Sequence, residues 1–269
     1  MRVAERIQHQ SVQPGSVAIW WLGQNSYVLK CSGCCLMIDP FFSRPGPPEK
    51  YLLEEVPLRA DELEPEAVLC THDHSDHTDP PFLSELAASS PNTRFFGPPE
   101  SVATMVAAGV PRDSTTTLEN AQTFRVGRAA VRVALSKTSS VSDVAHYGYL
   151  IESEGAKVYN TGDIMRGVTD EPSLMRPLQE AAPHVALITT SPTEEEFPDF
   201  AEAARLAMSI GARVAVPAHY HCFAKRTFDP APFVDEFPSS STTRPVVIPY
   251  CGCYLFSLSG PGEIVSAEA

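Results

Sequence analysis

Short apolar runs alternate with helical patterns along most of this chain of 269 residues. In the first third, runs rich in β-branched and aromatic residues predict strands, because such side chains fit the pleated surface of a sheet. We expect these strands at Val17–Trp21, Ser26–Lys30, Cys35–Ile38 and Ala67–Cys70. The residues Cys31-Ser32-Gly33 fall between the second and third runs and predict a hairpin turn. Four prolines within residues 40–48 predict a loop, since proline has no backbone donor.

Helical patterns then appear between further strands. We expect helices at Pro80–Ala88, Pro99–Ala108, Pro172–Ala181 and Pro198–Ile210. We expect strands at Thr93–Phe96, Ala130–Leu135, Tyr147–Glu152, Lys157–Asn160, Val185–Thr189, Arg213–Pro217, Val246–Tyr250 and Tyr254–Leu258. Grouped strands followed by interleaved helices indicate a layered α/β fold rather than a doubly wound sheet. We treat residues 1–15 as an N-terminal extension, either an arm that packs on a neighbour or a frayed end, and residues 16–269 as a single domain.

Charge and composition narrow the classes of function. The chain has 20 basic and 33 acidic residues, a net charge of −13, so it repels nucleic-acid backbones and a nucleic-acid partner is disfavoured. No stretch approaches the ~18 apolar residues that cross a bilayer, and the first residues lack the apolar core of a secretory signal. We therefore expect a cytoplasmic protein without a membrane partner. Its seven cysteines are expected to be reduced thiols, with a zinc site joining residues 31–35 to 251–253 as the less favoured alternative.

The densest chemistry follows the fourth expected strand, in the sequence His72-Asp73-His74-Ser75-Asp76-His77. Three of the eight histidines fall within this hexapeptide, which favours a metal site over a polar surface loop. His72 and His74 are two residues apart, so an extended backbone would direct both rings to the same side. Asp76 and His77 begin the turn into the next helix, so one loop offers two sets of ligands. Imidazole and carboxylate ligands suit Zn²⁺, Mn²⁺ or Fe²⁺.

The pattern HxHxDH after an apolar strand resembles the signature of the metallo-β-lactamase superfamily. The segments WLGQNSYVLK, THDHSDHTD, FFGPPESVATMVAAGVP and VPAHYHCFAKRTFDP resemble most closely its L-ascorbate-6-phosphate lactonase-like branch. This resemblance extends over almost the whole chain. It implies an α/β fold of four layers, αββα, in which two β-sheets lie between helices and the site lies at one edge between the sheets.

The resemblance also implies a set of metal ligands. These are His72, His74, Asp76, His77, Asp163 and His219, with Asp163 bridging two metals. It further implies that Asp39, in CLMIDPFF, supports the histidine loop by orienting a ligand imidazole; the alternative is a simple turn aspartate.

One position departs from the superfamily pattern. A third histidine usually serves the first metal, and none stands at the usual spacing before GYLIE. We expect His146 to lie within that strand or at its rim, so that the first set is incomplete. Water, substrate or a side chain such as Ser136 would then complete the shell. One or two divalent ions are expected, zinc or manganese in preference to iron.

The chemistry that follows is hydrolysis. A metal ion lowers the pKa of bound water from about 15.7 to about 7, giving a hydroxide that Asp76 could anchor. His221 is the candidate general acid, with a surface imidazole as the alternative. The candidate substrate-binding residues are Lys137, Tyr220, Lys225 and Arg226.

The expected function is a metal-dependent hydrolase of a small, anionic, ester-like substrate. The best-matched substrate is a lactone of a phosphorylated sugar derivative, as the lactonase-like resemblance implies. The alternatives are a small or cyclic phosphodiester, a metal-binding protein without catalysis, and an oxidoreductase of the kind that binds two irons. The resemblance also implies a homo-oligomer, for which the sequence gives no independent sign.

Overall fold

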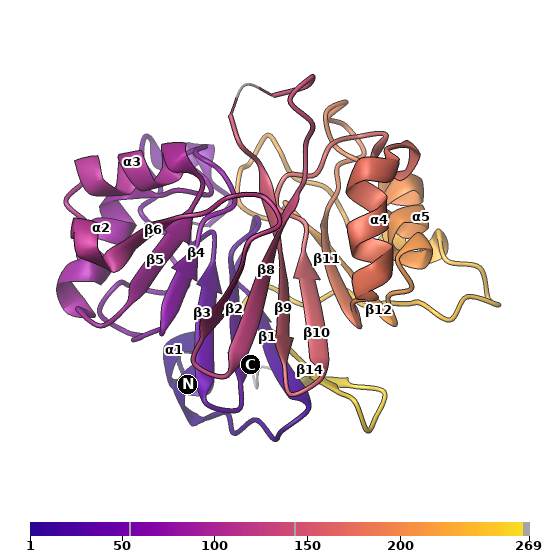
Figure 1. The fold of residues 1–269 in the computed structure, drawn as a ribbon, viewed down its shortest axis with the longest axis horizontal. Helices are drawn as coiled ribbons and strands as arrows, with labels where there is room; N and C mark the ends of the chain where they lie inside the picture. The colour runs from indigo at the N-terminus through magenta and orange to yellow at the C-terminus, as the bar shows by residue number, and fades with distance from the viewer. Residues whose placement is uncertain (54, 143, 266–269) are drawn as a thin grey trace.

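Two β-sheets lie back to back with helices on their outer faces, in a computed structural model that describes residues 1–53, 55–142 and 144–265 (Figure 1). The first sheet contains β1 Ser16–Trp21, β2 Tyr27–Cys31, β3 Cys34–Ile38, β4 Ala67–Leu69, β5 Arg94–Gly97, β6 Thr115–Thr117, β14 Cys253–Ser257 and β15 Glu263–Val265. Within the described residues their spatial order is β15-β14-β1-β2-β3-β4-β5-β6. The pairing is parallel from β3 to β6 and antiparallel elsewhere.

The second sheet supplies the other half of the sandwich. Its strands are β7 Thr123–Val126, β8 Ala129–Leu135, β9 Tyr147–Ser153, β10 Ala156–Asn160, β11 Val185–Thr189, β12 Val214–Ala218 and β13 Arg244–Pro245. Their order is β13-β12-β11-β10-β9-β8-β7, and β10 to β13 run parallel. Parallel neighbours bring their carboxyl ends to the same edge of the sheet, which is where ligands bind in α/β folds.

The helices cover the outer faces of both sheets. They are α1 Val3–His9, α2 Pro80–Ser89, α3 Pro99–Ala107, α4 Pro172–Ala181, α5 Phe200–Ser209 and α6 Ala231–Asp235, with 3₁₀ turns η1 Pro48–Lys50, η2 Arg112–Ser114 and η3 Val168–Asp170. Figure 1 shows α2 and α3 on the outer side of the first sheet and α4 and α5 on that of the second. Asp79 and Asp199 begin α2 and α5 by accepting backbone N–H bonds. Among the described residues, no helix has both the length and the apolar character to span a membrane.

The apolar core lies between the two sheets. Ile19 and Leu36 of the first sheet share one buried cluster with Ile151 and Leu187 of the second. The strands are also buried on their outer faces, where Trp20 packs in a separate cluster beneath the helices. Burial on both faces explains why the strands are nearly continuous apolar runs rather than alternating ones. The αββα architecture predicted above is therefore confirmed.

Two local features differ from the sequence-based expectations. Residues 1–15 contain α1, whose Ile7 packs with Trp20 on the outer face of the chain's own first sheet. The strand predicted at Val246–Tyr250 is wrong, because β13 ends at Pro245 and the following residues run on as extended loop. The Val246 N–H still donates to the Ala215 carbonyl of β12 at 2.8 Å, but Pro249 has no N–H to donate to a ladder, so the strand does not continue.

Candidate metal centre

The candidate site lies where strand ends of both sheets meet at one edge. The first sheet contributes the loop after β4, which carries His72 to His77. The second contributes Asp163 after β10, His219 directly after β12, and His146 directly before β9. No single element could place all these side chains together, so the centre depends on the packing of the two sheets.

The histidine loop is fixed by its own backbone. The N–H groups of His77 and Thr78 donate to the carbonyl of His74 at 2.9 and 2.8 Å. The Thr78 hydroxyl donates to the carbonyl of His72 at 2.8 Å. These bonds close the loop into a compact turn before α2, so that side chains at 72, 74, 76 and 77 project towards the sheet edge.

A first donor set contains three histidines, His72, His74 and His146, whose ligand atoms lie within 4.8 Å of one another. Nε2 of His72 is 2.9 Å from Nδ1 of His74, and the His146 ring stacks on His72 with centroids 4.0 Å apart. The prediction that this set lacks its third histidine is therefore wrong. β9 begins at Tyr147, as expected, and His146 stands directly before it at the rim of the strand, where the residue is buried and its ring faces His72.

A second donor set contains Asp76, His77 and His219, again within 4.8 Å. The Nε2 atoms of His77 and His219 each lie 3.8 Å from Oδ2 of Asp76. Both imidazoles are buried, while Asp76 is partly accessible and faces a cavity. This set offers two nitrogens and one carboxylate, a combination that suits a divalent transition metal.

Asp163 lies between the two sets and gives one carboxylate oxygen to each. Its Oδ2 is 3.6 Å from Nε2 of His72. Its Oδ1 is 3.4 Å from Nε2 of both His77 and His219. The preceding Gly162 has φ +53°, and a Cβ there would collide with the Tyr147 carbonyl oxygen. Glycine thus lets the loop after β10 approach the histidine loop closely.

Asp39 supports this centre from below. The carboxylate is fully buried and accepts four hydrogen bonds, from the backbone and hydroxyl of Thr71, from Asn25 and from Nδ1 of His77, each at 2.7 Å. A carboxylate on Nδ1 holds the proton there, which leaves Nε2 of His77 as the free ligand nitrogen. Asp39 adopts φ +43°, an uncommon conformation outside glycine that its hydrogen bonds stabilise.

The electrostatics and the unpartnered atoms fit a cation. Burial opposes a charged His77, but the carboxylates of Asp163, Asp39 and Asp76 together hold its pKa well above the ordinary value. Burial likewise opposes an ionised Asp163, yet His219 and His77 hold its pKa well below the ordinary value. Nε2 of His77 and Oδ1 of Asp163 are buried without a hydrogen-bond partner among the described residues. Their separation of 3.4 Å is short enough for both atoms to bind one metal ion at about 2.0–2.1 Å.

The charged and aromatic residues predicted for substrate binding separate into two groups. Lys225 and Arg226 line a cavity of about 480 Å³ beside Asp76, together with Lys50 and Phe223. Lys137 is buried, with Nζ 3.5 Å from Glu196 and 5.5 Å above the Phe197 ring, which packs on His219.

Lys137 lies close enough to the first donor set to affect the pKa of His146. Burial and the charge of Lys137 lower the pKa of His146 to about 3. Lys50 and Phe223 were not identified in the sequence, since a lone lysine and a lone phenylalanine give no local signal.

Three predicted residues have side chains that contact groups outside the donor sets. The Tyr220 ring packs in the inter-sheet core, 4.4 Å from Trp21. The His221 ring lies beside Tyr250 and Trp21, at centroid distances of 5.0 and 6.1 Å. Ser136 donates its hydroxyl to the Thr161 carbonyl. The Ser136 backbone N–H donates to the His146 carbonyl at 2.9 Å, so Ser136 lies beside the first donor set although its hydroxyl is engaged with Thr161.

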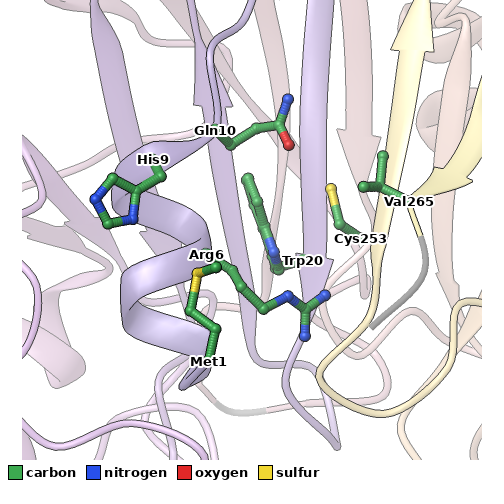
Figure 2. Close-up of a pocket in the computed structure, with 7 residues that line it drawn as sticks. All are labelled: Met1, Arg6, His9, Gln10, Trp20, Cys253 and Val265. Atoms are coloured by element: carbon green, nitrogen blue, oxygen red, sulfur yellow. The ribbon is translucent and has the colours of Figure 1, made fainter. Parts of the chain in front are cut away.

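A second cavity, of about 340 Å³, lies beneath α1 at the side of β14. Figure 2 shows Arg6 extending over Trp20 and towards Cys253 there. None of the metal-centre residues lines it. No cysteine joins a group able to hold a metal ion within residues 1–53, 55–142 and 144–265. The cavity beside Asp76, by contrast, is lined by a residue of the second donor set.

Comparisons with known proteins show which sequences and folds this chain is similar to. Residues 35–220 match the family model described as "Beta-lactamase superfamily domain". A "UPF0173 metal-dependent hydrolase" of Anaeromyxobacter sp. (strain K) is 30% identical, over 79% of this chain and 79% of that protein. A "Probable L-ascorbate-6-phosphate lactonase UlaG" of Salmonella heidelberg is 23% identical, over 84% of this chain and 75% of that one. Among solved structures, the metallo hydrolase Igni18 of Ignicoccus hospitalis superposes with a TM-score of 0.67 at 21% identity, covering 94% of this chain and 99% of that one.

Proposed function

The chain belongs to the beta-lactamase superfamily and is a metal-dependent hydrolase, and we propose that it opens the ring of a small anionic lactone. The best-matched substrate class is a lactone of a phosphorylated sugar derivative. The observation that carries this proposal is the pair of donor sets sharing Asp163 beside a cavity whose wall holds Lys50 and Lys225 as well as Glu49. A small substrate can reach the donor sets from this side, because Asp76 lines the cavity.

Both donor sets would hold divalent ions, zinc or manganese, in this proposal. Bound there, the ions would supply a water nucleophile of lowered pKa and would polarise the lactone carbonyl. Asp163 would hold the two sets at a fixed separation, since its two oxygens face different histidines. Asp39 would keep the His77 ring in the orientation and tautomer that a ligand needs.

The cavity beside Asp76 supplies the recognition of an anion. Lys50 lies over the Phe223 ring, with Nζ 5.4 Å from its centroid, so its charge is held at the cavity wall. Lys225 lines the same cavity, whereas Arg226 is already paired with Glu194. We assign the substrate phosphate to Lys50 and Lys225, and the face of the sugar ring to Phe223. The Salmonella relative, named a probable lactonase of a sugar-acid phosphate, supports this choice.

The test compares lactones with and without a phosphate. The metal-loaded protein should hydrolyse a phosphorylated sugar lactone, without phosphate release, with a higher kcat/KM than the same lactone lacking phosphate. Equal kcat/KM values would contradict the anion-binding role of the cavity. Cleavage of a cyclic phosphodiester in place of any lactone would assign the second candidate activity instead.

Lys225→Met gives the matched residue test. It should raise KM for the phosphorylated lactone while leaving the unphosphorylated one unaffected. Lys157→Met is the control, because Lys157 lies at the opposite end of β10 from Asp163 and donates to the Ala181 carbonyl. Equal effects of both substitutions would argue against a specific contact at Lys225.

A further inference from the structure

Gln24 is a buried side chain within hydrogen-bonding distance of the second donor set, and it has no part in the proposed hydrolysis. It follows β1 in a tight turn, with φ +52° and a side chain almost without exposure. Its backbone N–H donates to the carbonyl of Tyr220 at 2.8 Å, and its carbonyl accepts the N–H of His219 at 3.0 Å. These two bonds join the Gln24 turn directly to the loop that carries His219.

The side-chain amide of Gln24 reaches two metal-ligand candidates. Its Nε2 lies 2.9 Å from Oδ2 of Asp76 and 2.9 Å from Nε2 of His219. Its Oε1 is buried and has no hydrogen-bond partner among the described residues. The amide therefore directs its donors at the two atoms that would bind the cation, and its one acceptor at nothing.

A cation in the second donor set reverses this preference. Once Nε2 of His219 ligates a metal it can no longer accept a hydrogen bond, and an amide N–H facing the ion is repelled. A half-turn of the terminal torsion exchanges the oxygen and nitrogen of the amide without moving the rest of the side chain. One polar atom of the amide lacks a partner in either orientation, so burial does not favour one of them. The charge of the bound cation favours the orientation in which the oxygen faces it.

We propose that Gln24 is a further ligand of the second donor set, binding the metal ion through Oε1 beside Asp76, His77, Asp163 and His219. The 2.9 Å separations match the spacing of adjacent ligands about 2.0–2.1 Å from an ion with octahedral geometry. Amide oxygens are ligands for hard and borderline divalent ions. The inference rests on the proposed two-metal site but not on the lactone, because metal binding can be read without a substrate.

The experiment compares Gln24→Leu and Gln24→Glu with the wild-type protein by Co²⁺ titration, followed through stoichiometry, affinity and visible absorption. Gln24→Leu should weaken one of the two equivalents about 10-fold or more. It should also strengthen the Co²⁺ absorption, since Co²⁺ absorbs more strongly as its coordination number falls. Gln24→Glu retains an oxygen ligand and should bind at least as tightly as wild type.

The opposite pattern would overturn the inference. If Gln24 only donates to Asp76, Gln24→Glu places a second carboxylate against that residue and should weaken the metal, while the Gln24→Leu spectrum stays unchanged. Wild-type affinity and spectrum in Gln24→Leu would also exclude a ligand. Gln179→Glu, the same change at an exposed position of α4, is the control.

Two measurements on the wild-type protein distinguish a failure of the Gln24 inference from a failure of the two-metal site. Wild-type protein that binds no metal would contradict the proposed two-metal site itself, independently of Gln24. Should both variants fail to fold, the wild-type protein decides alone. In its metal-loaded crystal, an anomalous peak about 2.0–2.3 Å from the Gln24 amide oxygen supports the ligand. A peak beyond hydrogen-bonding distance from that oxygen overturns it.

Discussion

Replacing Asp39 by asparagine tests whether this buried carboxylate sets the metal affinity of His77. The amide can keep an oxygen towards His77, Asn25 and the Thr71 hydroxyl only by turning its NH₂ towards the Thr71 backbone N–H. One buried donor then faces another, which costs about 1–3 kcal/mol of the free energy of unfolding. The hydrogen bond to Nδ1 of His77 survives, but its acceptor is now neutral, and a neutral hydrogen bond is roughly half as strong as one to a charged group.

The expected effect on the metal follows from the weaker bond. Loss of a supporting partner of this kind lowers metal affinity about 10- to 100-fold. That change corresponds to about 1.4–2.8 kcal/mol less stabilisation by saturating metal. The assay measures urea unfolding of the chelator-treated protein and the Zn²⁺ dissociation constant by competition with a chromophoric chelator.

Asp79→Asn provides the matched control for Asp39→Asn. Asp79 is also buried and accepts bonds from Ser43 and Phe42, but it contacts no residue of the donor sets. The Asp79→Asn substitution should lower the free energy of unfolding and leave the Zn²⁺ affinity unchanged. If Asp39→Asn binds Zn²⁺ with wild-type affinity although its free energy of unfolding is lowered, the role assigned to Asp39 is refuted.

Three further perturbations probe the centre from different sides. Gly162→Ala places a Cβ against the Tyr147 carbonyl at φ +53°, so it should displace Asp163 and abolish tight metal binding, measured as metal stoichiometry. Gly167 has φ +78° and open space around it, so the control Gly167→Ala should only lower Tm modestly. Equal metal content in the two variants would contradict the close approach at Gly162. His146→Ala should reduce the tightly bound metal from about two equivalents to about one, measured by inductively coupled plasma mass spectrometry. The control His9→Ala, at an exposed position, should keep both equivalents. An unchanged metal content in His146→Ala would show that His146 is not a ligand of the first set. Because neighbouring carboxylates overcome burial and raise the pKa of His77, this ring carries a proton in the metal-free protein below that raised pKa, so metal uptake should release about one proton and affinity should rise with pH. Calorimetry in buffers of different ionisation enthalpy measures that release, and a heat independent of buffer would exclude it.

The sequence predicts the parts of this centre that are local. His72, His74, Asp76 and His77 stand within one hexapeptide after an apolar strand, so their grouping follows from chain geometry. Asp163 and His219 lie 86 and 142 residues beyond His77 by number, and only the resemblance to a known superfamily relates them to it. The ends of β10 and β12 meet the histidine loop because two sheets pack face to face, a tertiary property that no single segment carries.

The residues that the sequence missed depend on where strands begin and on how turns face. His146 directly precedes β9, and the bond from the Tyr147 N–H to the Thr71 carbonyl places that strand beside the histidine loop. Its position next to the strand that neighbours β10 was the available signal. Gln24 reaches the centre only through its pairing with Tyr220, which follows from the tertiary fold. Val246–Tyr250 shows the opposite error, in which an apolar run fills a core without forming a strand.

Anomalous scattering from metal-loaded crystals, recorded at the absorption edge of the bound metal, would locate each ion relative to Asp163. We expect two peaks on either side of Asp163, each about 2.0–2.2 Å from its ligand atoms. One peak should lie among His72, His74 and His146, and the other among Asp76, His77 and His219. A single peak, or two peaks of which neither contacts Asp163, would contradict the paired centre.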